Sequence, residues 1–384
     1  MKQSTVVVLG GGVGGTVAAT ELKRALRSRA RVILIEQQAQ RPFQQSLLWL
    51  MTGKRSVRQI TRPIGRLERR GIEVVRAEVT SVDPARRKVT AGGTEYSGDY
   101  LIVALGAEYV PASVPGLAAA GHSLYSVEGV EHIRDERLKV TGGTVAVLVA
   151  RTPFKCPAAP YEAAMLLQDD FKRRGLAGQV SVALYTPEPG PMPVTGPDNS
   201  AKVRAMVEAA GVKYNPQHAA ASVDPASRKI KFQNGAETDY SLLVYVPPHA
   251  APAVVRNAGL VSESGWVSVD RHTMETKFPG VYAIGDVTMV PLKVGMPLPK
   301  AGTFAHGQAK AVAASIAAKV TGKGAPGRFD GFGECFIEAG GGRAGMGSGD
   351  FYAEPAPQVR LRPVARRWHW GKVLFEKWWL WRRF

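Results

Sequence analysis

Two cysteines are the residues of this chain best suited to redox chemistry. Cys156 follows a cation, Lys155, and Cys335 lies about 180 residues later, so only the fold can bring the two sulfurs together. A pair of thiols can store two electrons as a disulfide, and a neighbouring ammonium group favours the reactive thiolate. The alternative is two free, inert core thiols, the usual state of cysteines in a reducing compartment. We expect the redox pair because of the segment in which Cys156 lies.

That segment stands where a second dinucleotide would otherwise bind. Residues 142–150 predict a turn and a buried parallel strand, which leads into Arg-Thr-Pro-Phe-Lys-Cys-Pro. The pyrophosphate of a dinucleotide needs a glycine-rich turn at this point, yet no glycine lies between Gly143 and Gly175. The sequence therefore predicts a thiol in place of an electron-donating nicotinamide cofactor.

A carboxyl group follows Cys156 closely. Glu162 is expected on the first turns of the next helix, six residues after the cysteine. A partly desolvated carboxyl there could carry protons to and from sulfur. An exposed first-turn acid, favoured by the helix dipole, is an equally good interpretation, so both stay open.

A complete dinucleotide-binding motif opens the chain. A strand buried on both faces is expected at residues 5–9, and Gly10, Gly12 and Gly15 after it fit Gly-x-Gly-x-x-Gly. A helix and a second strand follow, and Glu36 ends that strand at about the 20-residue offset at which a carboxylate accepts from a ribose hydroxyl. Strand, glycines, helix, strand and acid in this order indicate a bound dinucleotide.

Two later segments favour a flavin. One apolar strand ends in a small-residue turn at Ala104 and Gly106, and a second, at residues 281–284, is followed by Gly285 and Asp286. Together these motifs resemble those of the FAD-dependent disulfide-reductase-like superfamily. The resemblance implies FAD, with Asp286 on a ribityl hydroxyl. An Asp after a strand is also a common helix N-cap, which is the alternative role.

The most specific resemblance begins at Cys156. The run Cys156-Pro-Ala-Ala-Pro-Tyr-Glu162 is similar to the Cys-Pro-x-x-Pro-Tyr-Glu element of sulfide:quinone oxidoreductases and of the flavoprotein subunit of flavocytochrome c sulfide dehydrogenase. Residues 43–53 and 71–79 resemble segments of the quinone-reducing branch. In that branch the last residues of the second segment, here ending at Val79, contact adenine through their backbone.

This resemblance covers nearly the whole chain and implies an enzyme that oxidises sulfide at Cys156 and Cys335. Hydrosulfide attacks their disulfide and leaves a persulfide and a thiolate, and two electrons then pass through FAD to a membrane quinone. Lys300 matches a loop against the flavin pyrimidine and would stabilise the reduced ring, with a solvated loop lysine as the alternative. Phe336 and Phe351 are the candidates for quinone contacts.

The chain departs from the family in two ways. The quinone-reducing enzymes often carry a third cysteine, which this chain lacks, so the length of the sulfur chain that it can build is in doubt. The flavocytochrome flavoprotein links FAD through a cysteine, where this chain has Gln44, Gln45 and Ser46. We therefore expect FAD to be bound non-covalently.

The fold class is expected to be α/β, with two Rossmann-like doubly wound domains and an amphipathic C-terminal segment that associates with a membrane. The order of the motifs predicts a split FAD-binding domain around an inserted domain that carries Cys156, and a C-terminal region that carries Cys335. The expected divisions are residues 1–110, 111–265, 266–325 and 326–384.

The C-terminus alternates tryptophans with basic residues. At helical spacing, Trp370, Leu374, Trp378 and Trp381 fall on one stripe, typical of a helix that lies in the lipid headgroup layer. A packing helix or a contact between copies in a homo-oligomer is the alternative, and nucleic acid is disfavoured because the aromatic residues form a stripe. We expect residues 366–384 to contribute no FAD-binding or cysteine group.

The charge and hydropathy of the chain favour a membrane surface. The formal net charge is +18, and residues 359–384 hold eight Lys or Arg against one acid. Such a surface would attract anionic lipid or steer hydrosulfide, although much of it can be a solvated face. No stretch approaches the roughly 20 apolar residues that span a bilayer, and the first strand follows Met1 almost at once. We expect a peripheral, monotopic membrane protein on the cytoplasmic face, with no metal site.

The sequence thus predicts an FAD-dependent sulfide:quinone oxidoreductase. A flavocytochrome c-type sulfide dehydrogenase and an enzyme like the type II NADH:quinone dehydrogenases share the fold and are alternatives. A membrane-bound flavin redox sensor, whose cysteines only report redox state, is the non-enzymatic alternative.

Overall fold

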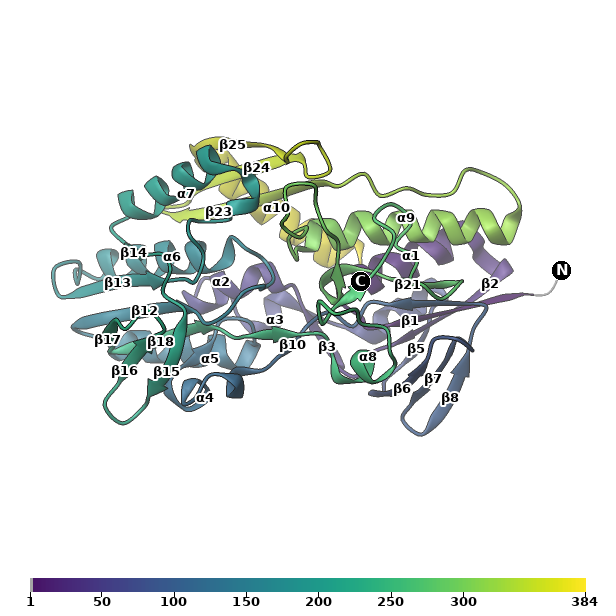
Figure 1. Ribbon diagram of the computed structural model, residues 1–384, viewed down its shortest axis with the longest axis horizontal. Helices are drawn as coiled ribbons and strands as arrows, with labels where there is room; N and C mark the ends of the chain where they lie inside the picture. The colour runs from purple at the N-terminus through teal and green to yellow at the C-terminus, as the bar shows by residue number, and fades with distance from the viewer. Residues whose placement is uncertain (1–2) are drawn as a thin grey trace.

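The structure is a computed structural model that describes residues 3–384, and its first sheet has five parallel strands (Figure 1). Their order is β21-β9-β1-β2-β5. The strands are β21 (Val281–Ala283), β9 (Tyr100–Val103), β1 (Ser4–Leu9), β2 (Ala30–Ile35) and β5 (Glu73–Val75). The β-branched runs of β1 and β2 are almost wholly buried, as expected for strands covered on both faces.

Helices cover one face of this sheet and a small sheet covers the other. α1 (Val13–Leu26) and α9 (Gly302–Thr321) pack together over Val6 and Val8 (Figure 1). An antiparallel sheet and α8 (Ala253–Asn257) cover Val7 and Leu9. The antiparallel sheet is β6 (Val79–Asp83), β7 (Lys88–Ala91) and β8 (Thr94–Ser97).

A second parallel sheet of five strands repeats this layered plan in the order β11-β18-β12-β13-β14. The strands are β11 (His122–Ser123), β18 (Leu242–Val246), β12 (Gly143–Val149), β13 (Val180–Tyr185) and β14 (Lys213–Asn215). The helices of this half are α2 (Leu47–Met51), α4 (Leu117–Ala120), α5 (Val127–Lys139), α6 (Ala159–Arg173) and α7 (Pro197–Ala209). A small antiparallel sheet consists of β15 (Ala220–Asp224), β16 (Lys229–Phe232) and β17 (Glu237–Asp239).

Short helices and short strand pairs complete the two halves. The short helices are η1 (Arg27–Arg29), η2 (Gln44–Ser46), α3 (Val57–Ile60), η3 (Ile64–Arg70), η4 (Pro111–Ser113), η5 (Pro193–Thr195) and η6 (Gly285–Val287). The short strand pairs are β3 (Gln40–Pro42) with β4 (Thr61–Pro63), β10 (Glu108–Tyr109) with β19 (His249–Ala250), and β20 (Val267–Ser268) with β22 (Thr288–Met289). The sheets are those of a mixed α/β Rossmann-type fold, and the domain divisions stay a prediction.

The C-terminal region is a three-stranded antiparallel sheet followed by a helix. The sheet is β23 (Phe332–Gly340), β24 (Arg343–Asp350) and β25 (Gln358–Ala365), and the helix is α10 (Arg366–Arg382). α10 packs against β24 and runs from this sheet toward α9 and α1 (Figure 1). Within residues 3–384, no helix combines the length and the apolar character needed to cross a bilayer.

α10 exposes the residues of the predicted stripe and buries its other side. Large fractions of Trp370 (62%), Leu374 (67%), Trp378 (42%) and Trp381 (75%) are exposed, so the spacing identified one face correctly. The opposite face buries two apolar and two charged side chains. They are Lys372, Glu376, Trp379 and Leu380. The expectation that residues 366–384 supply no FAD-binding or cysteine group stays a prediction, although the buried part of α10 belongs to the molecule's interior.

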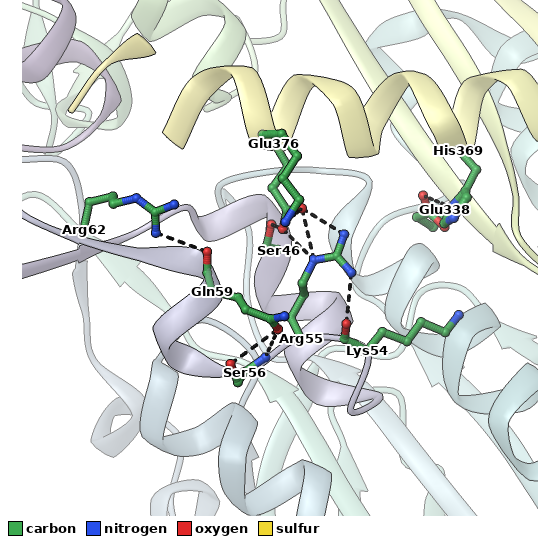
Figure 2. Close-up of polar contacts among 10 residues, drawn as sticks. Ser46, Lys54, Arg55, Ser56, Gln59, Arg62, Glu338, His369 and Glu376 are labelled. Carbon is green, nitrogen blue, oxygen red and sulfur yellow. Dashed lines mark hydrogen bonds and ion pairs between the residues drawn. The ribbon is translucent and has the colours of Figure 1, made fainter. Parts of the chain in front are cut away.

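A buried ionic contact holds α10 in place. Glu376, fully buried, accepts hydrogen bonds from Ser46 Oγ at 2.6 Å and from Arg55 Nη2 at 2.8 Å (Figure 2). The guanidinium of Arg55 also lies 4.7 Å from the centre of the Trp49 ring. The residues that the family resemblance placed after the ribose acid therefore dock the C-terminal helix.

Glu376→Ala is expected to lower the free energy of unfolding by about 3–5 kcal/mol, because it leaves the half-buried charge of Arg55 without its partner. Chemical denaturation of the purified variant measures this loss. The matched control is Glu354→Ala, since Glu354 is 57% exposed and faces Arg271 at 3.8 Å. That variant should change stability by less than about 1 kcal/mol. Equal effects of the two variants would contradict the role given to Glu376.

Candidate active site

One large cavity, of about 1390 Å³, joins the two sheets to the C-terminal region. Its walls include the glycine turn after β1, the ends of β2, β9 and β21, the loop before α6, strand β23 and one side of α10. Nearly all of the predicted site residues line it. They are Gly10, Gly12, Glu36, Val79, Ala104, Gly106, Cys156, Glu162, Gly285, Asp286, Lys300, Cys335, Phe336 and Phe351.

The glycine turn is built for close backbone approach. Gly10 has φ +94°, and a Cβ there would lie 2.5 Å from the carbonyl oxygen of Ala104. A Cβ at Gly15 would lie 1.8 Å from the carbonyl oxygen of Gly10, so Gly15 supports the turn from beneath and does not line the cavity. A side chain at either position would clash with the backbone and distort the turn. The turn could then no longer let a pyrophosphate approach its backbone closely.

Two carboxylates stand at the ends of strands beside this turn. Glu36 accepts from the backbone N–H of Gly11 at 2.6 Å and of Gln38 at 2.8 Å, which fixes it at the mouth of the turn. Asp286 keeps one buried carboxylate oxygen, Oδ1, without a hydrogen-bond partner within residues 3–384. It does not cap a helix, because the N-cap of η6 is Ile284. An unpaired buried acceptor that lines a cavity fits a hydroxyl of a bound dinucleotide.

The loop that carries Cys156 is pinned to the loop of Lys300. Cys156 has φ +49°, and its N–H donates to the carbonyl of Lys300 at 2.6 Å. Phe154 and Lys155 before it are 6% and 9% exposed, so the loop is filled with side chains. This packing leaves no glycine turn at the end of β12 for a second pyrophosphate.

The effect of Lys155 on the thiol has the expected sign but does not decide the pKa of Cys156. Burial, followed by the charge of Glu162, raises the pKa of Cys156 to about 12 and outweighs the opposing effect of Lys155. The amine of Lys155 donates to the side chain of Gln44 and lies 5.1 Å from the centre of the Tyr109 ring. Lys155 therefore favours the thiolate as expected, while burial and the charge of Glu162 act more strongly in the opposite direction.

Cys335 reaches the same cavity from strand β23. The residue is exposed at the cavity wall, and its Sγ donates to the carbonyl of Phe336 at 3.2 Å. Its position deep among protein atoms, and then negative charge at Cys156, raise its pKa. Both thiols are free. Two cysteines from distant parts of the chain thus face one cavity, while a bond between them stays a prediction.

Glu162 lies on α6 and is buried, with only 2% of its surface exposed. The interpretation as an exposed first-turn acid is therefore wrong. Its Oε2 accepts from Lys372 Nζ of α10 at 2.6 Å and from the backbone N–H of Glu338 at 2.8 Å. Burial raises the pKa of Glu162 even though Lys372 opposes the shift.

Sequence reasoning missed Lys372, which also lines the cavity. Its partner Glu162 lies 210 positions earlier, so no local spacing could connect the two residues. Beside this pair, His369 of α10 holds the buried carboxylate of Glu338 at 3.0 Å (Figure 2). The sequence does show Lys372 inside the predicted C-terminal helix. The aromatic stripe on the opposite face of that helix was the stronger pattern, so the lysine was not considered as a site residue.

Lys300 is buried and is not the solvated loop lysine of the alternative interpretation. Its Nζ donates to the carbonyls of Asp286 and Thr288, both at 2.8 Å, and lies 3.4 Å from the centre of the Trp266 ring. Burial lowers its pKa to about 7. Lys300 therefore secures the loop that carries Asp286, and its charge can change near neutral pH.

The C-terminal end of the cavity is aromatic. Phe351 packs edge-on against Phe304 with ring centres 5.0 Å apart, and Phe336 lies on the same wall. α10 and the last residue add further rings to the lining, of which only Trp378 belongs to the predicted stripe. They are Phe375, Trp378, Trp379 and Phe384. Such walls suit a flat, apolar ring system.

Comparison with known proteins agrees with this geometry. The family described as pyridine nucleotide-disulphide oxidoreductase matches residues 4–311. The mitochondrial sulfide:quinone oxidoreductase of Mus musculus is 28% identical over 301 residues, which are 74% of this chain and 66% of that protein. The sulfide-quinone reductase of Aquifex aeolicus is 27% identical over 401 residues, covering 98% of this chain and 90% of that one.

Solved structures show the same likeness. The X-ray structure of the sulfide:quinone oxidoreductase from Aquifex aeolicus matches with a TM-score of 0.88 at 25% identity, over 99% of this chain and 91% of that one. The alignment with the mouse protein spans just under two thirds of that relative. The chain belongs to the pyridine nucleotide-disulphide oxidoreductase family, as an FAD-dependent oxidoreductase that resembles the sulfide:quinone oxidoreductases over nearly its whole length.

Proposed function

We propose that this protein oxidises sulfide and passes the electrons to a membrane quinone. The observation that carries the proposal is the joint placement of Cys156 and Cys335 in the cavity that also holds the dinucleotide-binding turn. The relatives that cover the chain most fully have this activity in their names. The chemistry of two thiols beside a dinucleotide site fits the same reaction.

The sulfur step follows from thiol–disulfide exchange. Hydrosulfide attacks one sulfur of a Cys156–Cys335 disulfide, the S–S bond breaks, and the products are one persulfide and one thiolate. A second hydrosulfide takes the outer sulfur of the persulfide as hydrogen disulfide and leaves a second cysteine thiolate. Giving two electrons to bound FAD would then join the two cysteine sulfurs again as the disulfide. With two cysteines, the growing sulfur chain must stay between Cys156 and Cys335, so we propose short products.

Glu162 and Lys372 are proposed to handle the proton transfer that accompanies sulfide oxidation, with Glu162 as the acceptor. The carboxylate accepts the proton that hydrosulfide or the persulfide gives up, and Lys372 keeps that carboxylate charged despite its burial. Because the two groups touch at 2.6 Å, proton transfer to one changes the charge that the other feels. The pair therefore links sulfur chemistry to the position of α10.

The residues fit non-covalently bound FAD. Gly10 and Gly12 would approach its pyrophosphate, Glu36 a ribose, the backbone at Val79 the adenine, and Asp286 a ribityl hydroxyl. Bound there, FAD supplies a carrier that accepts two electrons from sulfur and releases them to quinone. Lys300 is proposed to favour the reduced state of the ring through its charge.

The quinone is proposed to enter at the aromatic end, beside Phe336 and Phe351. α10 contributes both to that wall and to the exposed stripe outside it. A stripe of tryptophans with basic flanks fits the headgroup layer of an anionic membrane, so a quinone could pass from lipid to cavity along one helix. We place the protein on the cytoplasmic face as a peripheral protein.

Sulfide, and not NADH, is expected to reduce the bound flavin. An anaerobic titration watched at the flavin absorbance bands tests this, first with sulfide and then with quinone to restore the oxidised bands. The loop from Arg151 to Cys156 buries the side chains of Phe154 and Lys155 and has no glycine to form a turn for the NADH pyrophosphate. Rapid bleaching by NADH in stopped flow, with none by sulfide, would refute the proposed donor.

Lys372→Gln is expected to move the acidic limb of sulfide-dependent flavin reduction to higher pH by about 1–2 units. The sign follows from the ion pair: Lys372 lowers the pKa of Glu162, so its loss raises that pKa further and more alkaline solution is needed to ionise the carboxyl. The measurement is the pH profile of the rate. Lys377→Gln, an exposed lysine of the same helix, is the control. An unmoved limb would mean that Glu162 does not accept the proton.

A further inference from the structure

A second cavity, of about 420 Å³, lies beside the first and is lined by cations. Three chain segments end there: α1, η3 and α10. α9 closes the cavity on another side. Six basic side chains line what we call the basic cavity. They are Lys23, Arg24, Arg70, Lys310, Arg382 and Arg383.

The positive charge of the basic cavity is poorly neutralised. Its one carboxylate, Glu21, is shared by Arg24 at 2.5 Å and Arg383 at 3.2 Å. In the part of the chain that the structure describes, no hydrogen bond or ion pair engages the side chain of Lys310 or Arg382. Burial, and then the charges of Arg382 and Arg383, lower the pKa of Arg70. Cations held together in this way favour an anion between them.

One wall offers buried N–H groups. Arg383 is 7% exposed and donates to Thr20, Glu21 and His306, yet its Nε finds no acceptor within residues 3–384. His306 is neutral, because burial and the charge of Arg383 lower its pKa to about 4. An unpaired guanidinium N–H at a cavity wall suits an oxyanion.

Capping of helix ends does not account for this cluster. Lys23 donates to the carbonyl of Arg27 at 3.0 Å and Arg70 to that of Arg382, as basic side chains at helix C-termini often do. Glu21 engages Arg24 and Arg383, so within residues 3–384 Lys310 and Arg382 are the two cations of the cavity whose side chains have no hydrogen-bond or ion-pair partner. The surplus donors converge on the cavity from separate elements.

We propose that the basic cavity binds the phosphate of an anionic phospholipid headgroup. A phosphate has several acceptor oxygens and matches convergent guanidinium and ammonium groups. The lipid source follows from Trp378, which lines the basic cavity and belongs to the exposed stripe with Leu374 and Trp381. The headgroup would sit in the cavity while the acyl chains lie along the stripe. This inference rests on the proposed membrane association and names its lipid contact.

The test compares two double variants of the full-length, FAD-loaded protein. Lys310→Gln with Arg382→Gln removes two cations of the basic cavity. Arg366→Gln with Arg367→Gln removes the same charge from the other end of α10, outside the cavity. The side chains of both pairs are exposed, so the two variants differ in position and not in exposure. Flotation with phosphatidylglycerol vesicles in a phosphatidylcholine background measures each affinity. We expect the cavity pair to bind about tenfold more weakly than the control pair, since a charge-assisted hydrogen bond contributes on that order.

If the two double variants lose vesicle affinity equally, the proposed headgroup site is overturned, and only diffuse electrostatic attraction to the membrane remains. Equal binding of wild-type protein to pure phosphatidylcholine vesicles would overturn it too. A further measurement adds inorganic phosphate at constant ionic strength and tests whether the cavity binds a free anion instead of a lipid headgroup. If it stabilises the wild-type protein against heating and not the cavity pair, while no vesicle is bound, the lipid assignment is overturned. The sulfide titration needs no membrane, so it reports on the proposed reaction separately.

Discussion

Cys156→Ser and Cys335→Ser are each expected to remove sulfide-dependent quinone reduction, with a loss of at least about a thousandfold, while the purified protein stays yellow. Serine has nearly the size of cysteine but forms no disulfide, so hydrosulfide has no S–S bond to attack. Neither residue belongs to the dinucleotide-binding turn or to the carboxylates beside it. Steady-state turnover and the flavin content of each variant are the two measurements.

The control for this pair is Ser348→Ala, on β24, the strand that pairs with the strand of Cys335. Ser348 pairs with Glu334 in the sheet and does not line the cavity, so its loss should leave turnover unchanged. Full activity in either cysteine variant would show that sulfur is not handled by the pair. Loss of the yellow colour together with activity would instead point to damage of the fold.

The regular part of the fold could be predicted because its signals are local. Apolar runs placed two strands to within a residue or two, Ser4–Leu9 of the first sheet and Gly143–Val149 of the second. The glycine turn was equally readable, since Gly10 and Gly15 leave no room for a Cβ. Helical spacing also identified the exposed face of α10.

The electrostatics of the site could not be predicted, because they depend on partners far away in sequence. Lys155 adjoins Cys156, yet its amine turns to Gln44 and Tyr109. The cation that meets the buried carboxyl of Glu162 comes from α10, close to the end of the chain. Two residues that are adjacent in sequence have neighbouring backbones, but the charged end of a long side chain such as lysine can lie several ångströms away from its neighbour.

The two faces of α10 explain why this helix was misjudged in part. A helix with large aromatic residues on its exposed side, and with two charged residues beside two apolar ones on its buried side, departs from the ordinary amphipathic pattern. Glu376 and Lys372 are tolerated inside because Arg55 and Glu162 meet them. Deleting residues 366–384 would therefore unpair Glu162 and open the cavity, so it cannot separate membrane binding from catalysis.

Substitutions confined to the exposed face of α10 can separate membrane binding from catalysis. We expect the triple variant Trp370→Gln, Leu374→Gln and Trp381→Gln to fold, bind FAD and be reduced by sulfide in a single turnover at the wild-type rate. These side chains are 62%, 67% and 75% exposed and do not line the large cavity, whereas the buried residues of α10 stay in place. The variant should float with anionic vesicles about a hundredfold more weakly, because three large apolar side chains no longer enter the lipid.

The same variant should react poorly with a long-chain quinone embedded in vesicles and normally with a soluble short-chain quinone, which need not be drawn from lipid. The matched control is Leu138→Gln, since Leu138 is 55% exposed at the end of α5, away from α10. It should change neither flotation nor the rate with either quinone. If the triple variant floats as the wild type does, the exposed stripe is a contact between copies of the chain. The path of the quinone along α10 would then lose its support, while the sulfur chemistry at Cys156 and Cys335 would stand unaffected.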